Sequence, residues 1–390
     1  MKRDAVIVAA VRTPIARNGG ALATLPAHYY GATVIKEAMN RARVTADMID
    51  DVIMGNVLSG GGNIARLSAL KTGLSLEIPG LTVDRQCGSG LNAITLAAQA
   101  VESGDGDIYV AGGIESYSQA PYLMSKPDKL YSVQPPPFRK SQLSPREIGN
   151  PPMGITAENL VKKYGISREE QDAFALASQQ KMANAMAEKR FDEQIVPVSV
   201  PKGKGETFLF AEDEHPRPQT TMEGLGKLPP AFVEGGSVTA GNSSGLNDAA
   251  CALVIMAREK AKELGLQPFA TVRSRAVAGV DPNIMGIGPV PAVRKVLQKS
   301  GLTLDDMDLI EINEAFAAQV IACDRELQLD PNKVNVNGGA IAHGHPLGAT
   351  GAILATKAVY ELRRVPGRYA LLTACIGGGQ GIAVILEREN

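Results

Sequence analysis

The chain has 390 residues, a formal net charge of −1 and 21% charged residues. It contains no basic run or stripe, so neither nucleic acid nor a membrane surface is expected as a partner. Glycine is abundant (41 residues), aromatic residues make up 4%, and tryptophan is absent. This composition favours an α/β enzyme with many tight strand-to-helix turns over a β-sandwich or a repeat array, and the length suits two or three domains.

The cysteines also bear on metal binding and on the cellular compartment. The four cysteines, Cys87, Cys251, Cys323 and Cys375, include no C-x-x-C pair, and none has a histidine at metal-ligand spacing. No zinc site and no disulfide framework are therefore expected, which points to a reducing compartment. The apolar run at 5–11 is too short for a signal peptide, so the protein is expected to be cytoplasmic.

The first part of the chain alternates apolar segments with helical patterns, which predicts a parallel sheet covered on both faces. The predicted strands lie at 5–11, 51–57, 81–83 and 107–113, and the predicted helices lie at about 28–42, at about 65–73 and from Gly88 onward.

The composition changes after about residue 117. Residues 121–152 are rich in proline, serine, lysine and arginine and show no period, which predicts an irregular excursion. The run Ser-Arg-Glu-Glu at 167–170 has the form of a capping box and opens a polar helix to about Arg190. Polar loops follow until strand and helix patterns resume near Thr239. An insertion of this length usually carries ligand contacts.

The last part of the chain loosely repeats the first. Residues 307–313 match 49–57, and residues 368–375 match 107–113. A glycine-flanked turn at 344–351 matches the turn that carries Cys87. Three matches in the same order predict two duplicated α/β halves.

Cys87 stands on a small-residue turn in front of an amphipathic helix, whose apolar positions include Ile94, Ala97 and Val101. The positive end of the helix dipole is expected to lower the pKa of this thiol and make it reactive. The alternative is a buried structural thiol, since free cysteine is among the most buried residue types.

Two histidines compete for a role in the segment at 338–351. His345 lies between Gly344 and Pro346, where a neutral imidazole could accept a thiol proton or donate to a carbonyl oxygen. Its alternative is a loop histidine that faces solvent. The spacing between His343 and His345 is poor for joint metal binding on a helix, so no metal is proposed.

Two further turns complete the candidate site. Cys375 precedes three glycines, whose successive N–H groups could stabilise an oxyanion; the alternative is a tight strand connection. Asn313 could orient a water or a substrate oxygen, although such a residue is more often a helix cap. Two thiols, one imidazole and backbone donors suit carbon–carbon bond formation or cleavage between acyl thioesters.

Five short motifs then occur in one order and together resemble the thiolase family over essentially the whole chain, closest to its biosynthetic branch. They are Cys-Gly-Ser-Gly-Leu at 87–91, Gly-Asn-Ser-Ser-Gly-Leu-Asn-Asp at 241–248, Asn-Glu-Ala-Phe-Ala at 313–317, Gly-Gly-Ala-Ile-Ala with Gly-His-Pro at 338–346, and Cys-Ile-Gly-Gly-Gly at 375–379.

The resemblance implies a role for each catalytic candidate. Cys87 would be the acylated nucleophile, and His345 its base and an oxyanion donor. Cys375 would be the acid and base at the substrate α-carbon. Asn313 would hold the water of one oxyanion hole, and the N–H groups of Cys87 and Gly377 would form the other. The remaining implied residues bind substrate: Arg217 and Ser244 would contact coenzyme A, and Met153, Phe232, Met285 and Phe316 would line the acyl and pantetheine tunnel.

The resemblance also implies an architecture and a reaction. The fold would be five-layered (αβαβα), with one half at 1–117 plus 247–268, a loop domain at 118–246, and a second half at 269–390. Two acetyl-CoA would be converted to acetoacetyl-CoA and CoA, reversibly and by a ping-pong mechanism, with no metal or redox cofactor. A homodimer or a dimer of dimers is expected.

Three positions depart from the family pattern: Asp84 replaces the usual asparagine, Pro152 replaces a histidine of biosynthetic members, and His343 replaces an aliphatic residue. Three alternative functions remain. A degradative thiolase for longer 3-ketoacyl chains differs only in pocket volume. A decarboxylating condensing enzyme would carry a histidine instead of Asn313 and would lack Cys375. A non-catalytic acyl-CoA binding protein would have little need for two cysteines and an imidazole on separate turns.

Overall fold

The computed structural model describes residues 3–59, 62–127, 129, 131, 134–203 and 205–389. One large mixed sheet runs through the molecule in the order β12-β13-β14-β11-β1-β10-β5-β3-β4, with the short β2 paired to β10. The sheet consists of two halves that meet where β1 and β11 pair over only two residue pairs, Val6 with Thr271 and Ile7 with Ala270. Within the described residues, no helix has the length and apolar character needed to cross a membrane.

The N-terminal half of the sheet has three parallel strands at its outer edge. The strand β3 pairs in parallel with β4 and β5, and β10 is antiparallel to both β5 and β1. Except for the partly exposed β4, these strands are near-continuous buried runs rich in small and β-branched residues, as expected for strands covered on both faces. Their bounds are β1 (Ala5–Arg12), β2 (Ala16–Arg17), β3 (Asp51–Gly55), β4 (Gly80–Val83), β5 (Ile108–Glu115) and β10 (Asn247–Ala257).

The C-terminal half repeats this pairing, which confirms the predicted duplication. Here β12 is parallel to β13, β13 is antiparallel to β14, and β14 is antiparallel to β11. An isolated parallel bridge between Ile310 and Val334 stands where β4 stands beside β3. The matched segments therefore fall on equivalent strands, β12 with β3 and β13 with β5. The bounds are β11 (Ala270–Gly279), β12 (Leu309–Ile312), β13 (Tyr369–Ile376) and β14 (Gln380–Arg388).

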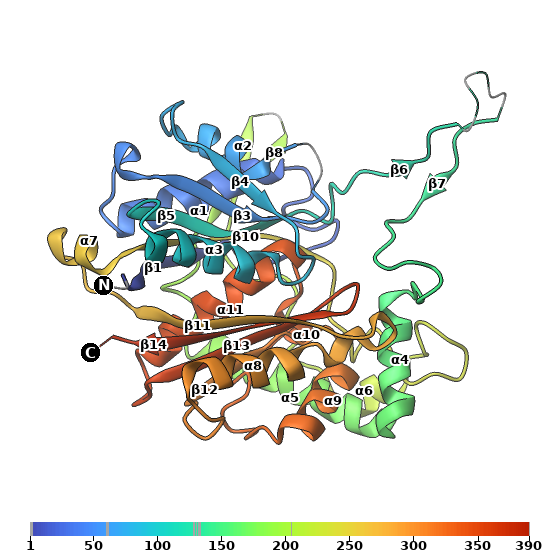
Figure 1. The fold of residues 1–390 in the computed structure, drawn as a ribbon. Helices are drawn as coiled ribbons and strands as arrows, with labels where there is room; N and C mark the ends of the chain where they lie inside the picture. Colours follow the sequence, from blue (N-terminus) through green and yellow to red (C-terminus); the bar gives the residue numbers. More distant parts are fainter. Residues whose placement is uncertain are drawn as a thin grey trace.

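Helices cover both outer faces and fill the space between the halves, which gives the predicted five layers (Figure 1). The helices α3 (Ser89–Ser103) and α11 (Leu347–Leu362) pack in the centre, where one apolar cluster joins them to both halves of the sheet. Separate clusters join α1 and α2 to the outer N-terminal face and α8 and α9 to the outer C-terminal face. Their bounds are α1 (Ala27–Arg41), α2 (Ile64–Thr72), α8 (Pro289–Ser300) and α9 (Ala317–Leu327).

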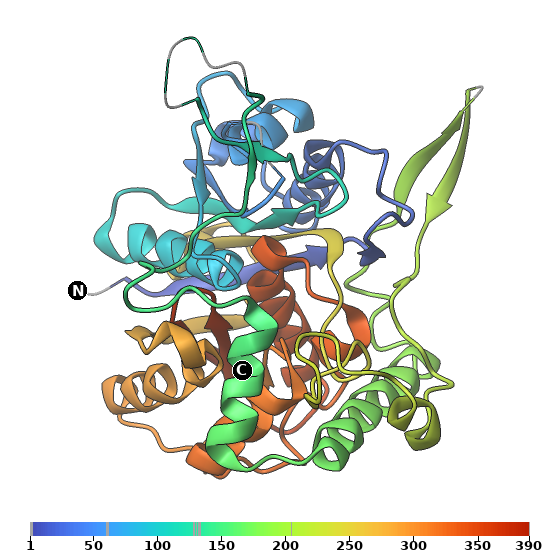
Figure 2. The same ribbon diagram turned by 90° about the vertical axis from the view of Figure 1, so that its right-hand side faces the viewer.

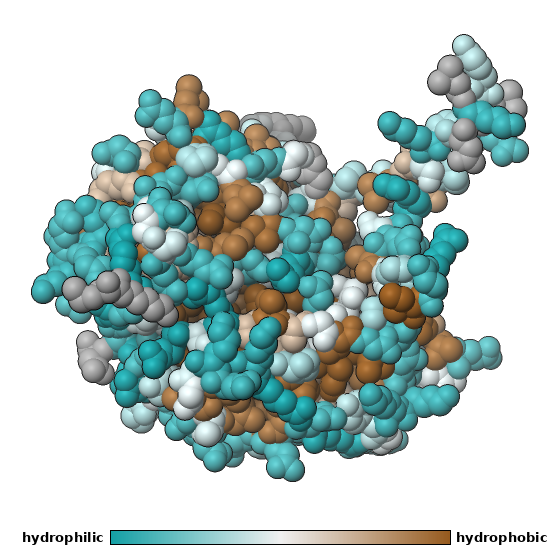
Figure 3. Space-filling view, viewed as in Figure 1, coloured by the Kyte–Doolittle hydropathy of each residue, from teal (hydrophilic) through white to brown (hydrophobic). Residues whose placement is uncertain are grey.

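The middle of the chain is only partly irregular. The strands β6 (Leu123–Met124) and β7 (Phe138–Arg139) lie on an arm that extends away from the body (Figures 1 and 3). The helix α5 (Arg168–Ala187) starts with the predicted capping box between Ser167 and Glu170.

Several elements of the middle region were not predicted from the sequence. They are α4 (Met153–Tyr164), α6 (Met222–Gly226) and the projecting hairpin of β8 (Val198–Gly203) and β9 (Glu206–Phe210) in Figure 2; the segments of α6 and of the hairpin were predicted to be loops. The remaining short elements are η1 (Ala46–Met48), α7 (Arg258–Glu263), η2 (Pro282–Ile287) and α10 (Ala340–His343). The division into three domains at the residues given above stays a prediction.

Candidate active site

A pocket of about 800 Å³ opens beside the start of α3, and it is the place where most of the predicted site residues meet. Its wall includes two of the catalytic candidates, Cys87 and His345, and all six of the predicted substrate-binding residues: Met153, Arg217, Phe232, Ser244, Met285 and Phe316. These residues come from six separate stretches of the sequence. The fold therefore brings residues that are distant in the sequence together around one pocket.

The turn that carries Cys87 is held in an unusual backbone conformation. Gln86 has a φ of 45°, in the left-handed region, and its N–H donates to Asp84 Oδ1 at 2.8 Å. Asp84, one of the departures from the family pattern, thus stabilises the turn through a local side-chain hydrogen bond. A Cβ on Gly88 would come within 2.6 Å of the Ile376 side chain, so a larger residue there would require that side chain to move. The turn leaves Cys87 half-buried, directly in front of α3.

The Cys87 thiol is not activated by its position at the helix start. Burial raises its pKa to about 11, although the N–H of Gly377 donates a hydrogen bond to the sulfur and lowers the pKa in part. The expectation of a lowered pKa is therefore wrong, because the loss of hydration outweighs the helix dipole. The resting group is a neutral thiol that needs a base.

His345 has the hydrogen bonds that such a base requires. Its Nδ1 lies 2.6 Å from Thr350 Oγ1, and the Thr350 hydroxyl donates to Pro346 O at 3.1 Å. The hydroxyl proton is used there, so its oxygen accepts from Nδ1–H. Nε2 then carries the lone pair of the ring and accepts from Asn313 Nδ2–H at 3.4 Å. Burial lowers the pKa of His345 to about 4, so the ring is neutral near pH 7.

The loop in front of His345 is fixed by buried charges. Lys357 Nζ donates to Gly338 O at 2.6 Å and to Glu311 Oε2 at 2.7 Å. The carboxylate of Glu314 accepts from the N–H of Ile341 at 3.1 Å. Buried polar groups of this kind are costly unless partnered, so their hydrogen bonds hold the loop in one conformation.

Asn313 lies against the imidazole. Its Nδ2 is 3.4 Å from His345 Nε2, and its backbone N–H donates to Thr373 O at 2.9 Å. Its side chain is fully buried, and Oδ1 has no hydrogen-bond partner in the part of the chain that the structure describes. An unpaired buried acceptor costs about 1–3 kcal/mol, so this atom is well placed to accept from a water or a substrate group.

The second thiol lies just behind the pocket wall. Cys375 is fully buried and packs in one cluster with Met285 and Phe316, which line the pocket. Burial raises its pKa well above the usual value, and interaction with Cys87 raises it further. Cys375, Gly377 and Asn313 are not among the residues that line the pocket, but each adjoins a residue that is.

The pocket has an apolar interior and a basic opening. The rings of Phe232 and Phe316 meet edge to face, with centroids 5.9 Å apart. Arg17 and Arg217 are both exposed at the pocket, and none of the described residues that line it is acidic. Such a lining fits an elongated ligand with an apolar end and an anionic end.

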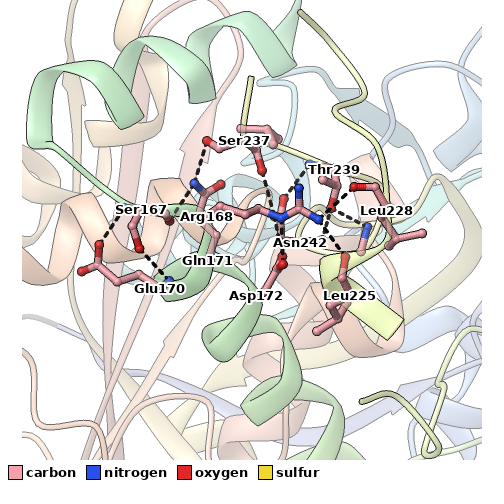
Figure 4. Close-up of polar contacts among 12 residues, drawn as sticks. Ser167, Arg168, Glu170, Gln171, Asp172, Leu225, Leu228, Ser237, Thr239 and Asn242 are labelled. Carbon is pink, nitrogen blue, oxygen red and sulfur yellow. Dashed lines mark hydrogen bonds and ion pairs between the residues drawn. The ribbon is translucent and has the colours of Figure 1, made fainter. Parts of the chain in front are cut away.

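The start of α5 fixes one wall of the pocket (Figure 4). Arg168 Nη2 donates to the carbonyl oxygens of Leu225 and Leu228, at 2.7 and 2.9 Å. Asp172 accepts from both Arg168 and Asn242, at 2.7 and 2.9 Å. These bonds hold the segments that place Leu225, Leu228 and Ser244 in the wall.

The other two departures from the family pattern lie in or near the site. Pro152 lines the pocket directly in front of α4. His343 is buried; its Nδ1 lies 2.9 Å from Gly344 O, and its Nε2 has no hydrogen-bond partner among the described residues.

Sequence reasoning missed four residues that shape the site. Asn247, which accepts from the N–H of His345 at 2.9 Å, stood inside a quoted motif, and Thr350 stood in the glycine-flanked turn at 344–351, but neither had an assigned role. Glu115 is a buried acceptor at the end of β5 that holds the N–H of Gly348 at 2.9 Å. The only feature of the sequence that could have indicated Glu115 is its position as a carboxylate at the end of an apolar strand. No sequence pattern indicated a role for Arg17.

The comparisons agree with this geometry. Two family models match, the thiolase N-terminal domain over residues 5–259 and the thiolase C-terminal domain over residues 266–388. The acetyl-CoA acetyltransferase of Pseudomonas aeruginosa is 49% identical, covering 99% of this chain and 100% of the relative. The acetyl-CoA acetyltransferase of Escherichia coli K12 is 48% identical, covering 100% of each chain.

Solved structures give the same result. The crystal structure of the Bacillus anthracis acetyl-CoA acetyltransferase has a TM-score of 0.95 at 44% identity, covering 100% of this chain and 99% of that one. Human mitochondrial 3-ketoacyl-CoA thiolase in complex with CoA has a TM-score of 0.92 at 43% identity, covering 100% and 98%. The chain therefore belongs to the thiolase family. The predicted fold class and the predicted acyltransferase class are confirmed.

Proposed function

We propose that this protein is an acetyl-CoA C-acetyltransferase, which condenses two acetyl-CoA to acetoacetyl-CoA and CoA and catalyses the reverse thiolysis. One observation carries the proposal: the thiol of Cys87 and the neutral imidazole of His345 open onto one pocket that is lined by arginines and by no described acidic residue. The relatives named above as acetyl-CoA acetyltransferases support the choice of substrate.

The first half-reaction forms an acyl-enzyme. His345 Nε2 takes the proton of Cys87, whose sulfur attacks the thioester carbonyl of acetyl-CoA. The N–H groups of Cys87 and Gly377 stabilise the oxyanion of the tetrahedral intermediate, a contribution of about 3 kcal/mol per donor. The C–S bond to CoA then breaks, and the leaving thiolate takes the proton of Cys375. Acetylated Cys87, protonated His345 and the Cys375 thiolate remain.

The second half-reaction makes the carbon–carbon bond. The raised pKa of Cys375 makes its thiolate a strong base, which removes a proton from the α-carbon of a second acetyl-CoA. His345 and a water on Asn313 Oδ1 stabilise the enolate, which attacks the acetyl carbonyl on Cys87. The C–S bond breaks, acetoacetyl-CoA forms, and His345 returns its proton to Cys87. Every proton is accounted for, so this sequence needs no metal or redox cofactor.

A second candidate function is a thiolase for longer 3-ketoacyl-CoA chains. The structural similarity to human mitochondrial 3-ketoacyl-CoA thiolase and the absence of the histidine side chain at Pro152 favour it. Met153, Met285 and Phe316 wall the acyl end in either case, and their flexibility decides how much chain is accepted.

One experiment tests the proposal and separates the two candidates. Thiolysis by CoA is measured for about seven 3-ketoacyl-CoA substrates whose acyl chains have roughly four to sixteen carbons. We expect kcat/KM to be highest for acetoacetyl-CoA and to fall with chain length. A maximum at a longer chain would replace the first proposal with the second, and no thiolysis of any chain would refute both.

We further propose that the enzyme works in the cytoplasm and forms a homodimer or a dimer of dimers. We also propose that each chain has the three domains predicted from the sequence. The reduced state that two catalytic thiols need supports the compartment. Exposed apolar side chains on the arm, among them Tyr122 and Phe138, support assembly. Sedimentation velocity tests the assembly, and a monomer at micromolar concentration would contradict it.

A further inference from the structure

Arg17 is a cation at the pocket for which neither the motifs nor the comparisons give a role. Arg17 and Arg217 both line the pocket and are exposed there. Within the described residues, neither guanidinium has a hydrogen-bond or ion-pair partner. Arg12, five residues earlier in the chain, is instead buried and paired with Asp213 at 2.7 and 2.9 Å. Arg17 therefore has its charge available for a ligand.

The backbone of Arg17 is fixed even though its side chain is free. Arg17 ends β2 and pairs with Asn247 of β10, and its N–H donates to Glu214 Oε2 at 2.9 Å. The Asn247 side chain also donates to Ala16 O at 2.9 Å and accepts from the N–H of His345 at 2.9 Å. One asparagine thus links the strand of Arg17 to the catalytic histidine and fixes the spacing between them.

His215 lines the same pocket as the two arginines. Its Nδ1 lies 3.4 Å from Asn247 Nδ2. Burial, together with the charges of Arg217 and Arg17 and against the opposing charge of Asp213, lowers the pKa of His215 to about 4. Both guanidiniums therefore act on one imidazole.

We propose that Arg17 and Arg217 together bind the phosphate groups of the CoA moiety at the opening of the pocket, and that Arg17 is a substrate-binding residue. Guanidinium groups match phosphate oxygens with paired hydrogen bonds and keep their charge at every working pH. The proposal rests on the proposed function, because it requires a CoA thioester as the substrate. It implies that Arg17 selects for the phosphorylated carrier and takes no part in the chemistry.

The test compares substrates with and without phosphate. Thiolysis of acetoacetyl-CoA by CoA and of acetoacetyl-N-acetylcysteamine by N-acetylcysteamine is measured for the native enzyme and for Arg17→Met. We expect the ratio of kcat/KM for the CoA substrate to kcat/KM for the truncated substrate to fall about tenfold in Arg17→Met. The fall should come from a higher KM for the CoA substrate, with kcat unchanged. Arg17→Lys should recover part of the ratio. Lys36→Met, at an exposed lysine of α1 away from the pocket, should leave it unchanged.

The outcomes are distinguishable. An unchanged ratio in Arg17→Met, with or without an equal loss of both activities, would overturn the role of Arg17. Absence of thiolysis in the native enzyme would refute the proposed function itself. Dephospho-CoA substrates then identify the bound group. If Arg17→Met has the same kcat/KM as the native enzyme with dephospho-CoA substrates, Arg17 binds the 3′-phosphate. If the loss of kcat/KM persists with these substrates, Arg17 binds the pyrophosphate.

Discussion

The Nδ1 atom of His345 lies 2.6 Å from the hydroxyl oxygen of Thr350, at the start of α11. This hydrogen bond assigns the imidazole tautomer, because the hydroxyl proton goes to Pro346 O. Nε2 therefore carries the lone pair, which accepts from Asn313 Nδ2–H in the resting site and can accept the thiol proton during the reaction. Thr350 therefore fixes the tautomer of the catalytic base without contacting the substrate itself.

Replacing Thr350 should weaken this base without removing it. In Thr350→Val the Nδ1–H loses its acceptor, which costs about 1–3 kcal/mol and frees the ring to turn or change tautomer. We expect the rate of Cys87 acetylation, followed in single turnovers, to fall about 10- to 100-fold. Thr350→Ser keeps the hydroxyl and should act within about threefold of the native enzyme. Equal rates in the valine and serine variants would contradict this role.

The Cys87 thiol should be protonated at neutral pH. Because burial raises its pKa to about 11, no thiolate forms until the pH approaches that value. The check is the ultraviolet thiolate absorbance of the native enzyme minus that of Cys87→Ser, between pH 6 and 10. We expect no difference at pH 7 and a rise only at the alkaline end. A thiolate signal already present at pH 7 would mean that Cys87 and His345 rest as an ion pair.

His343 should make the protein sensitive to acid. Burial lowers its pKa well below the usual value, and the charges of Lys357 and Arg12 and the nearby His215 act in the same direction. Below about pH 6.5 the unfolded chain binds a proton that the folded chain excludes. The free energy of unfolding therefore falls as the pH falls, by up to about 1.4 kcal/mol per pH unit for this group.

His343→Leu places an aliphatic side chain at this buried position and removes this proton linkage. Urea unfolding at pH 7.5 and pH 5.5 should show a smaller loss of stability in the variant than in the native protein. His215 and His345, whose pKa values are also lowered, remain in both proteins, so the comparison isolates one residue. The same loss in both proteins would show that His343 is not the acid-sensitive group.

Lys357 and Glu311 form a fully buried ion pair, and breaking it from one side should be costly. In Lys357→Met the carboxylate of Glu311 loses its partner, and Gly338 O loses its donor. We expect the free energy of unfolding to drop by about 3–5 kcal/mol. The double variant with Glu311→Leu removes both charges and should regain most of that stability. If the double variant were less stable than Lys357→Met, the unpaired carboxylate would not be the cause.

Short-range features of this fold followed from the sequence. The start of the helix after Cys87, predicted near Gly88 and found at Ser89, and the capping box of Ser167 and Glu170 both depend on neighbouring residues. The duplicated halves were visible because equivalent strands kept their apolar runs. Four of the five thiolase motifs contribute residues to the pocket wall, and the fifth, at 375–379, contributes none.

Long-range features did not follow from the sequence. Asn247 holds the N–H of His345 across 98 residues, and no local pattern marks such a pair. The Cys87 pKa depends on burial by distant elements, so an argument from the helix start alone had the wrong sign. The helix α4 packs on η2 of the C-terminal half. Most of the stability of a helix in a protein comes from such tertiary packing, which a local sequence pattern does not show.

The most direct test of the mechanism is the site of acetylation. Native enzyme, Cys87→Ser and Cys375→Ser are each mixed with acetyl-CoA, quenched in acid and analysed by intact and peptide mass spectrometry. We predict one acetyl group on Cys87 in the native enzyme and in Cys375→Ser, with no exchange of substrate α-protons in deuterated water in the latter. Cys87→Ser should carry none. An acetyl group on Cys375, or one that persists in Cys87→Ser, would contradict the assignment of the nucleophile.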